Sequence, residues 1–142
     1  SRPGEQRWGP PESRRYFHYW RDRSGRWHQT QMRGVSGNRP KIFTDRRDNA
    51  YMIYSSQIRP SAMADGHLLA KGQLVIAAAT AQSGWGDWTV IHTEDGPFVN
   101  EMLGDPYRWM IEQVLSVMVQ ESPKEAHDAT SLRILDFSFQ RQ

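Results

Sequence analysis

The feature that most constrains the fold of this chain is a succession of short strand-like segments, several of which alternate apolar and polar residues. Such segments cover residues 15–22, 26–32, 40–44, 50–56, 73–81, 87–93 and 131–139, and glycine, proline, asparagine or aspartate residues separate them. Alternation with a period of two is typical of strands that bury one face, and the turn-forming residues between segments are typical of hairpins. The pattern therefore predicts an all-β protein.

The spacing of the segments indicates which β architecture to expect. Those at 40–44, 50–56, 73–81 and 87–93 group into four strands within about 50 residues, the length of one β-propeller blade. We predict β-propeller blades over residues 15–142, about three four-stranded blades in all; a sandwich or a barrel is the alternative. Residues 1–14 are rich in proline and arginine and predict an arm or linker.

Two stretches carry additional structural signals. The stretch 106–120 fits a helix that begins at Pro106 or a strand over "VLSVMVQ", and the pattern leaves both open. In the strand after "SGWG", alternation places Trp88, Val90 and His92 on one face.

Composition and charge narrow the classes of partner. The chain has 142 residues, no cysteine and a net charge of +2, so it contains neither a disulfide framework nor a thiolate metal site. Residues 1–35 carry eight arginines against three acids, but aromatic and proline residues interrupt them, which disfavours nucleic acid as the partner. No apolar run reaches the roughly 18 residues of a membrane span. We therefore expect no membrane partner.

Several motifs resemble one family. The stretches "YFHYWRDRSGRWHQTQ", "GNRPKIFTDRRDNAYMIYS", "LVIAAATAQSGWGDWTVIHTEDGPFVNE" and "LSVMVQE…LRILDF" resemble the carboxy-terminal part of BNR-repeat propellers of the BNR-4 group. That group includes ulvan lyases and other lyases that cut rhamnose–glucuronate linkages. The resemblance covers residues 15–139 and implies part of a seven-bladed propeller. The stretch "DRSGRW" departs from the Asp-box pattern, and the family's catalytic histidine and tyrosine have no counterpart here.

The resemblance implies a function as well as a fold. It implies a polysaccharide lyase that cleaves uronate polymers by β-elimination, in a secreted or periplasmic location. The alternatives are a sialidase-like glycoside hydrolase and a non-catalytic module that binds glycans. The expected partners are an acidic polysaccharide and, to complete the ring, the remaining blades or other copies of the chain. A structural calcium or zinc ion shared with those blades is a further expectation.

The motif "GNRPK" contains the strongest candidate for substrate binding. Pro40 restricts Arg39 to an extended conformation, and the strand that follows is the innermost strand of its blade. Arg39 would present its guanidinium to a uronate carboxylate, or pair with a structural acid. Asn38 would bind a sugar hydroxyl or hold the turn, and Glu101 would accept hydrogen bonds from hydroxyls or lie in a solvated turn.

Aromatic residues supply the other candidates. His18, beside Trp20 in "YFHYW", is the candidate acid, base or metal ligand, and core packing is the alternative. Trp20 is a further candidate for substrate binding. Trp85 would stack on a sugar ring or, with Trp88, pack between blades. The five histidines show no metal-binding spacing, and Asp45, Asp48 and Asn49 lack the spacing of a calcium loop.

Overall fold

The computed structural model describes residues 15–57, 61–62, 68–69, 72–99, 101–125 and 127–139. The arm predicted for residues 1–14 lies outside these ranges. The strands and helices, in chain order, are β1 (Tyr16–Arg21), β2 (Trp27–Met32), β3 (Asn38–Thr44), β4 (Ala50–Ser55), β5 (Ser61–Ala62), β6 (Leu68–Leu69), β7 (Gly72–Ala79), the 3₁₀-helix η2 (Ala81–Ser83), β8 (Thr89–Phe98), β9 (Leu103–Gly104), α1 (Pro106–Glu112), β10 (Val114–Gln120) and β11 (Leu132–Ser138). The prediction of an all-β protein is confirmed.

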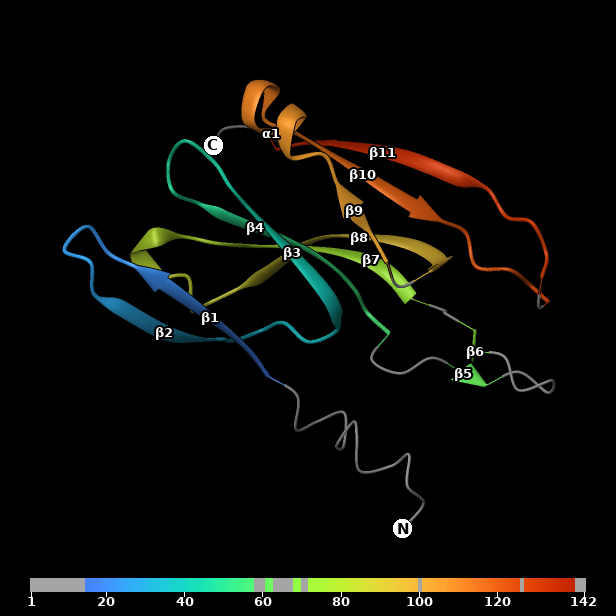
Figure 1. Ribbon diagram of the computed structural model, residues 1–142, viewed down its shortest axis with the longest axis horizontal. Helices are drawn as coiled ribbons and strands as arrows, with labels where there is room; N and C mark the ends of the chain where they lie inside the picture. The colour runs from blue at the N-terminus through green and yellow to red at the C-terminus, as the bar shows by residue number, and fades with distance from the viewer. Residues whose placement is uncertain are drawn as a thin grey trace, which may run out of the picture.

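Three antiparallel sheets make up most of the described chain (Figure 1). The amino-terminal hairpin is β1–β2, the central sheet has the order β3-β4-β7-β8, and the carboxy-terminal sheet has the order β11-β10-β9. The strands of the central sheet pair in the order in which they occur along the chain, and the short pair β5–β6 is inserted between β4 and β7. The central sheet is therefore a four-stranded meander built from the four segments that the sequence grouped together.

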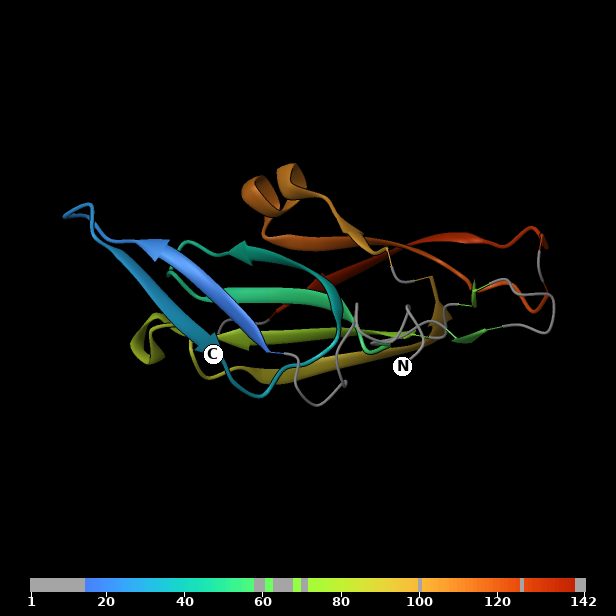
Figure 2. The same cartoon turned by 60° about the horizontal axis from the view of Figure 1, so that its bottom comes forward.

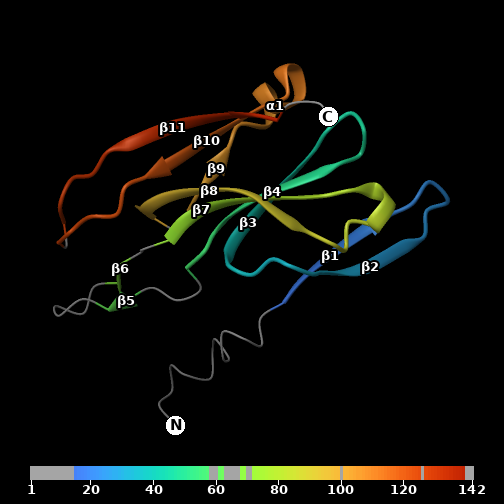
Figure 3. The ribbon, with the colours of Figure 1, turned by 180° about the vertical axis from the view of Figure 1, so that it is seen from behind.

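The central sheet has a core on each face, because the amino-terminal hairpin and the carboxy-terminal sheet lie on opposite sides of it (Figures 2 and 3). The hairpin core is formed by Met32, Val35, Ala50, Met52, Tyr54, Val75, Ala77, Ala79 and Trp88. The second core is formed by Ile53, Leu74, Ile76, Phe98, Met102, Trp109, Leu115, Val117 and Val119. Strands β4 and β7 contribute to both cores because alternate side chains point to opposite faces.

The turns of the first two hairpins share one design. Asp22 begins the turn after β1 and Asp45 begins the turn after β3. Each carboxylate accepts a hydrogen bond from the backbone N–H four residues later, at 3.0 Å and 2.9 Å. The residue three positions after each aspartate has a positive φ, 90° at Gly25 and 62° at Asp48. Glycine and aspartate tolerate this conformation, so the sequence itself determines both turns.

The predicted face of β8 was wrong because the strand contains a bulge. Val90 lies opposite Ala77 of β7, but His92 lies opposite Ile76, so one residue of β8 has no partner. Ala77 belongs to the hairpin core and Ile76 to the second core. Trp88 and Val90 therefore face the hairpin, whereas His92 faces the carboxy-terminal sheet. An inserted residue reverses the alternation of every residue after it.

The stretch that was open between helix and strand contains one of each. Asp105 caps the helix α1 by accepting from two backbone N–H groups, and Pro106 occupies its first turn. Gln113 ends the helix at φ 57° and β10 begins directly after it. Trp109 anchors α1, since its Nε1 donates to the carbonyl of Thr44 at 2.7 Å. Within the described ranges, no helix has the length and apolar character needed to cross a membrane.

Candidate functional site

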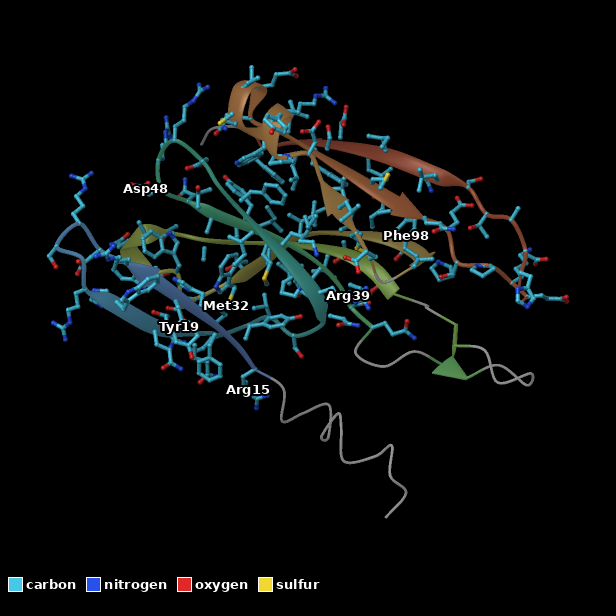
Figure 4. All side chains as sticks on the ribbon, viewed as in Figure 1. Arg15, Tyr19, Met32, Arg39, Asp48 and Phe98 are labelled. Carbon is cyan, nitrogen blue, oxygen red and sulfur yellow. The ribbon has the colours of Figure 1, made fainter. Side chains whose placement is uncertain are left out.

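The predicted residues Arg39 and Glu101 meet in one charged cluster. Arg39 is near the start of β3. This end of β3 is the one farther from the tip of the amino-terminal hairpin (Figure 4). Its guanidinium donates to one carboxylate oxygen of Glu101, and Lys41 Nζ lies 3.3 Å from the other oxygen. Glu101 belongs to the segment that leads into β9. We call Arg39, Lys41 and Glu101 the charged cluster.

The backbone of Arg39 differs from the prediction. We expected an extended conformation before Pro40, but Arg39 has φ 49° in the left-handed region. The register of β3 against β4 shifts between Asn38 and Lys41, so Arg39 and Pro40 form a bulge. A bulge accommodates proline, which has no N–H for the ladder. A non-glycine residue with this φ costs about 1–2 kcal/mol, and such strain is common at binding sites.

The electrostatics of the cluster favour an additional anion. The hydrogen bond from Arg39, followed by that from Lys41, holds the pKa of the Glu101 carboxyl below its usual value. Two cations therefore share one ionised carboxylate, and the cluster carries one net positive charge. The side chains of Arg39, Lys41 and Glu101 are 58%, 37% and 41% exposed, so solvent reaches all three. Asn38 begins β3 beside the cluster, opposite Ser55.

The other predicted residues, His18, Trp20 and Trp85, form a separate aromatic pocket. Its volume is about 160 Å³, and its lining residues are His18, Trp20, Ile42, Thr44, Ala50, Trp85 and Trp88. Trp85 makes T-shaped contacts with His18 and Trp20 at ring-centre distances of 5.9 Å and 5.1 Å. Trp20 also stacks on His28, whose Nε2 lies 2.7 Å from a carboxylate oxygen of Asp22.

Two polar atoms in this aromatic region do not use their hydrogen-bonding capacity. His18 Nδ1 and Trp20 Nε1 are both buried, and neither has a hydrogen-bond partner among the described residues. Burial lowers the pKa of the His18 imidazole, because the charged form loses its hydration. Burial therefore favours the neutral form of His18.

Trp85 and Trp88 both serve packing between the hairpin and the central sheet. Trp88 is buried in the hairpin core, and its Nε1 donates to the carbonyl of Trp85 at 2.8 Å. Trp85 packs against the same core and donates from Nε1 to the carbonyl of Asp48 at 2.8 Å. Both indoles therefore pack between the hairpin and the central sheet, and packing between propeller blades stays a prediction. Trp85 also lines the pocket, so stacking of a sugar ring on Trp85 stays a prediction.

The charged cluster and the aromatic pocket lie on opposite faces of the central sheet. Lys41 is paired with Ile53, which belongs to the second core. Ile42, which lines the pocket, is paired with Met52 of the hairpin core. Directly opposed residues of an antiparallel pair point to the same face, so Lys41 and Ile42 point to different faces. The structure thus groups the six predicted residues into two sets of three.

Lys41 is the one member of the charged cluster that the sequence did not single out. It is two residues after Arg39, and the bulge at Arg39 and Pro40 brings both cations to Glu101. Its only sequence signal is its place at the end of the "GNRPK" motif. A bulge is not visible in the alternation pattern, so this role required the structure.

Across the described part of the chain, no three histidine, aspartate or glutamate side chains gather where they could hold a metal ion. The carboxylate of Asp45 accepts hydrogen bonds from the backbone N–H groups of Arg47 and Asn49. A comparison of the chain with protein-family models and with curated proteins found no match. The resemblance to BNR-repeat propellers therefore stays a prediction.

Proposed function

We propose that this chain is a segment of a β-propeller that binds an acidic polysaccharide at the charged cluster. The observation that carries the proposal is the convergence of Arg39 and Lys41 on the single carboxylate of Glu101. The remaining positive charge suits the carboxylate of a uronate residue, and the Arg39 guanidinium matches that group in shape. Glu101 would hold the two cations in place and accept hydrogen bonds from sugar hydroxyls.

The order of the sheets supports the propeller arrangement. The central sheet is a meander of four strands, and a sheet lies against each of its faces. Its first strand, β3, is next to β9, the first strand of the following sheet: a Cβ atom on Gly104 would lie 2.3 Å from Phe43 Cζ. The first strands of propeller blades surround the central channel. In this proposal the charged cluster would face that channel, where a polymer is bound.

The proposed reaction of the complete propeller is β-elimination. Neutralising the uronate carboxylate makes the neighbouring C5 proton more acidic and stabilises the enolate-like transition state. The base must lie within hydrogen-bond distance of that proton. His18 belongs to the amino-terminal hairpin and lines the pocket between that hairpin and the central sheet, on the other side of the central sheet from Lys41. The proposal therefore assigns the base to a residue other than His18. A secreted or periplasmic location is part of the same proposal.

A non-catalytic glycan-binding module is the second candidate. The separation of His18 from the charged cluster favours it, because the cluster itself contains two cations and an ion-paired carboxylate rather than a free base. The two candidates share the binding step and differ in product. A lyase leaves an unsaturated end that absorbs ultraviolet light, and a binding module leaves the polymer intact.

The binding step is tested with Arg39→Ala. The probes are a glucuronate-containing polymer and the same polymer after reduction of its carboxyl groups, with affinity measured by calorimetry. For a half-exposed charge-assisted hydrogen bond we expect a loss of about 1 kcal/mol, or roughly fivefold in affinity, for the acidic polymer. The reduced polymer should show no change. Ultraviolet absorbance of the same mixtures reports cleavage.

Arg33→Ala is the matched control. Arg33 is also an exposed arginine in an ion pair with one acid, Asp87, and its side chain is 60% exposed. It lies outside the charged cluster, so its replacement should leave the affinity for both polymers unchanged. Equal losses for the two arginine variants, or equal losses for the acidic and the neutral polymer, would rule out a carboxylate site at Arg39.

A further inference from the structure

The outer face of the amino-terminal hairpin carries three exposed aromatic side chains among polar ones. The inner side chains of β1 and β2 pack on the central sheet, and the alternate residues point outward. Phe17, Tyr19 and Trp27 lie on this outer face; Tyr19 is 64% and Trp27 67% exposed. Figure 4 shows Tyr19 on the hairpin and Met32, a core residue, between the hairpin and the central sheet. We call this surface the hairpin face.

The opposite end of the molecule has an apolar surface. Leu103, Met118 and Ile134 lie in one row across β9, β10 and β11, because Met118 is paired with both of the others. Leu132 lies beside this row, and Leu132 and Ile134 are each 62% exposed. The other side of the same sheet carries Leu115, Val117 and Val119 of the second core. We call the row and Leu132 the terminal face.

The two ends carry opposite charge. Residues 15–33, which form the hairpin, contain five arginines and one aspartate. Residues 101–139, which form the carboxy-terminal sheet and its connections, contain seven acidic residues against three lysines and arginines. The hairpin end is therefore positive by four charges and the terminal end negative by four. Complementary charges steer association and fix orientation, whereas two like ends would repel each other.

We infer that the hairpin face of one copy of this chain binds the terminal face of a second copy. The contact would repeat the stacking of sheets inside the chain, where the hairpin and the carboxy-terminal sheet each cover one face of the central sheet. The contact joins two different surfaces, so it is heterologous and can continue into a ring or a longer assembly. The inference rests on the end faces alone and is independent of polysaccharide binding.

The test uses one variant for each end. Tyr19→Asp places a negative charge in the hairpin face, and Ile134→Arg places a positive charge in the terminal face. Both side chains are largely exposed, so folding should be retained and is checked by circular dichroism. In sedimentation velocity the wild-type chain should associate, and each variant alone should be a monomer. An equimolar mixture should form a heterodimer, because Tyr19→Asp keeps a terminal face and Ile134→Arg keeps a hairpin face.

Ile91→Arg is the control, since Ile91 is an exposed apolar residue of β8, in the central sheet rather than on an end face. It should associate like the wild type. The inference fails if the wild-type chain remains a monomer at its highest soluble concentration. It also fails if the mixed variants remain monomers, or if one variant alone still associates like the wild type, since that second result means a contact between two identical faces. The polysaccharide titration is read separately, so either proposal can fail alone.

Discussion

Replacing Trp85 separates the packing role of this residue from a role as a sugar platform. Its indole makes T-shaped contacts with His18 and Trp20 and donates a hydrogen bond to the carbonyl of Asp48. These contacts join the turn before β8 to the hairpin and to the turn after β3. A platform residue on a solvent-exposed loop would lack them. We therefore expect Trp85→Ala to destabilise the fold as well as to change the pocket.

The magnitude follows from burial and from the hydrogen bond. Removing a fully buried tryptophan costs about 3–5 kcal/mol, and Trp85 is half-buried, so its packing contributes roughly 2 kcal/mol. The lost hydrogen bond adds about 1 kcal/mol. Trp85→Ala should therefore lower the free energy of unfolding by about 2–3 kcal/mol. Trp85→Phe retains most of the packing and should lose about 1 kcal/mol.

The backbone of Trp85 supplies a second, sharper expectation. Its φ is 56°, a conformation that costs a non-glycine residue about 1–2 kcal/mol. Glycine avoids this cost, but its greater conformational entropy in the unfolded chain destabilises the folded protein by about 0.4–1 kcal/mol. Trp85→Gly should therefore be just under 1 kcal/mol more stable than Trp85→Ala. At an extended position the order would be reversed.

Urea unfolding followed by far-ultraviolet circular dichroism measures all three variants without relying on tryptophan fluorescence. With a slope of about 2 kcal/mol/M, the midpoint of Trp85→Ala should fall by about 1 M or more. A loss below about 0.5 kcal/mol, typical of surface sites, would refute the packing role and leave the platform interpretation. A glycine variant less stable than the alanine variant would refute the argument from backbone conformation.

Two further predictions concern stability. Gly37→Ala would place a Cβ atom 2.3 Å from the carbonyl oxygen of Ser55 and 2.4 Å from Cδ2 of Tyr54. We therefore expect the free energy of unfolding, measured in urea, to fall by about 1–3 kcal/mol. An unchanged urea midpoint would contradict this close approach. The hydrogen bond from His28 holds the pKa of the Asp22 carboxyl well below its usual range. The ionised Asp22 carboxylate therefore stabilises the fold fully above about pH 4, and this stabilisation is lost as the pH falls. The unfolding free energy of Asp22→Asn should therefore fall less than that of the wild type between about pH 5 and pH 3, and equal slopes would argue against this role.

Much of the fold was predictable because its signals are local. The strand character of β1, β2, β3, β4, β7 and β11 is visible in the sequence, and so are the turns that begin at Asp22 and Asp45. Bulges were not predictable. The extra residue in β8 and the strained Arg39 in β3 depend on what the neighbouring strand presents, which a single strand's pattern does not contain.

The candidate site was predictable as a set of residue types but not as a set of neighbours. Arg39 and Glu101 are 62 positions apart, and no spacing rule connects them. His18 and Arg39 were placed in one mechanism, yet His18 faces the hairpin side of the central sheet and Lys41, beside Arg39, the other side. Which face a side chain occupies depends on register, and register is set by pairing across the sheet.

The sequence by itself determined most of the strands, the hairpin turns at Asp22 and Asp45 and the chemistry that each position can offer. These follow from φ/ψ preference, alternation and side-chain charge, which are properties of a few consecutive residues. Only the tertiary structure decided that Lys41 joins Arg39 on one carboxylate and that Trp85 bonds to Asp48 from another turn. It also decided which apolar faces remain exposed. These outcomes depend on contacts between segments far apart in the chain, and such contacts form only when the sheets stack.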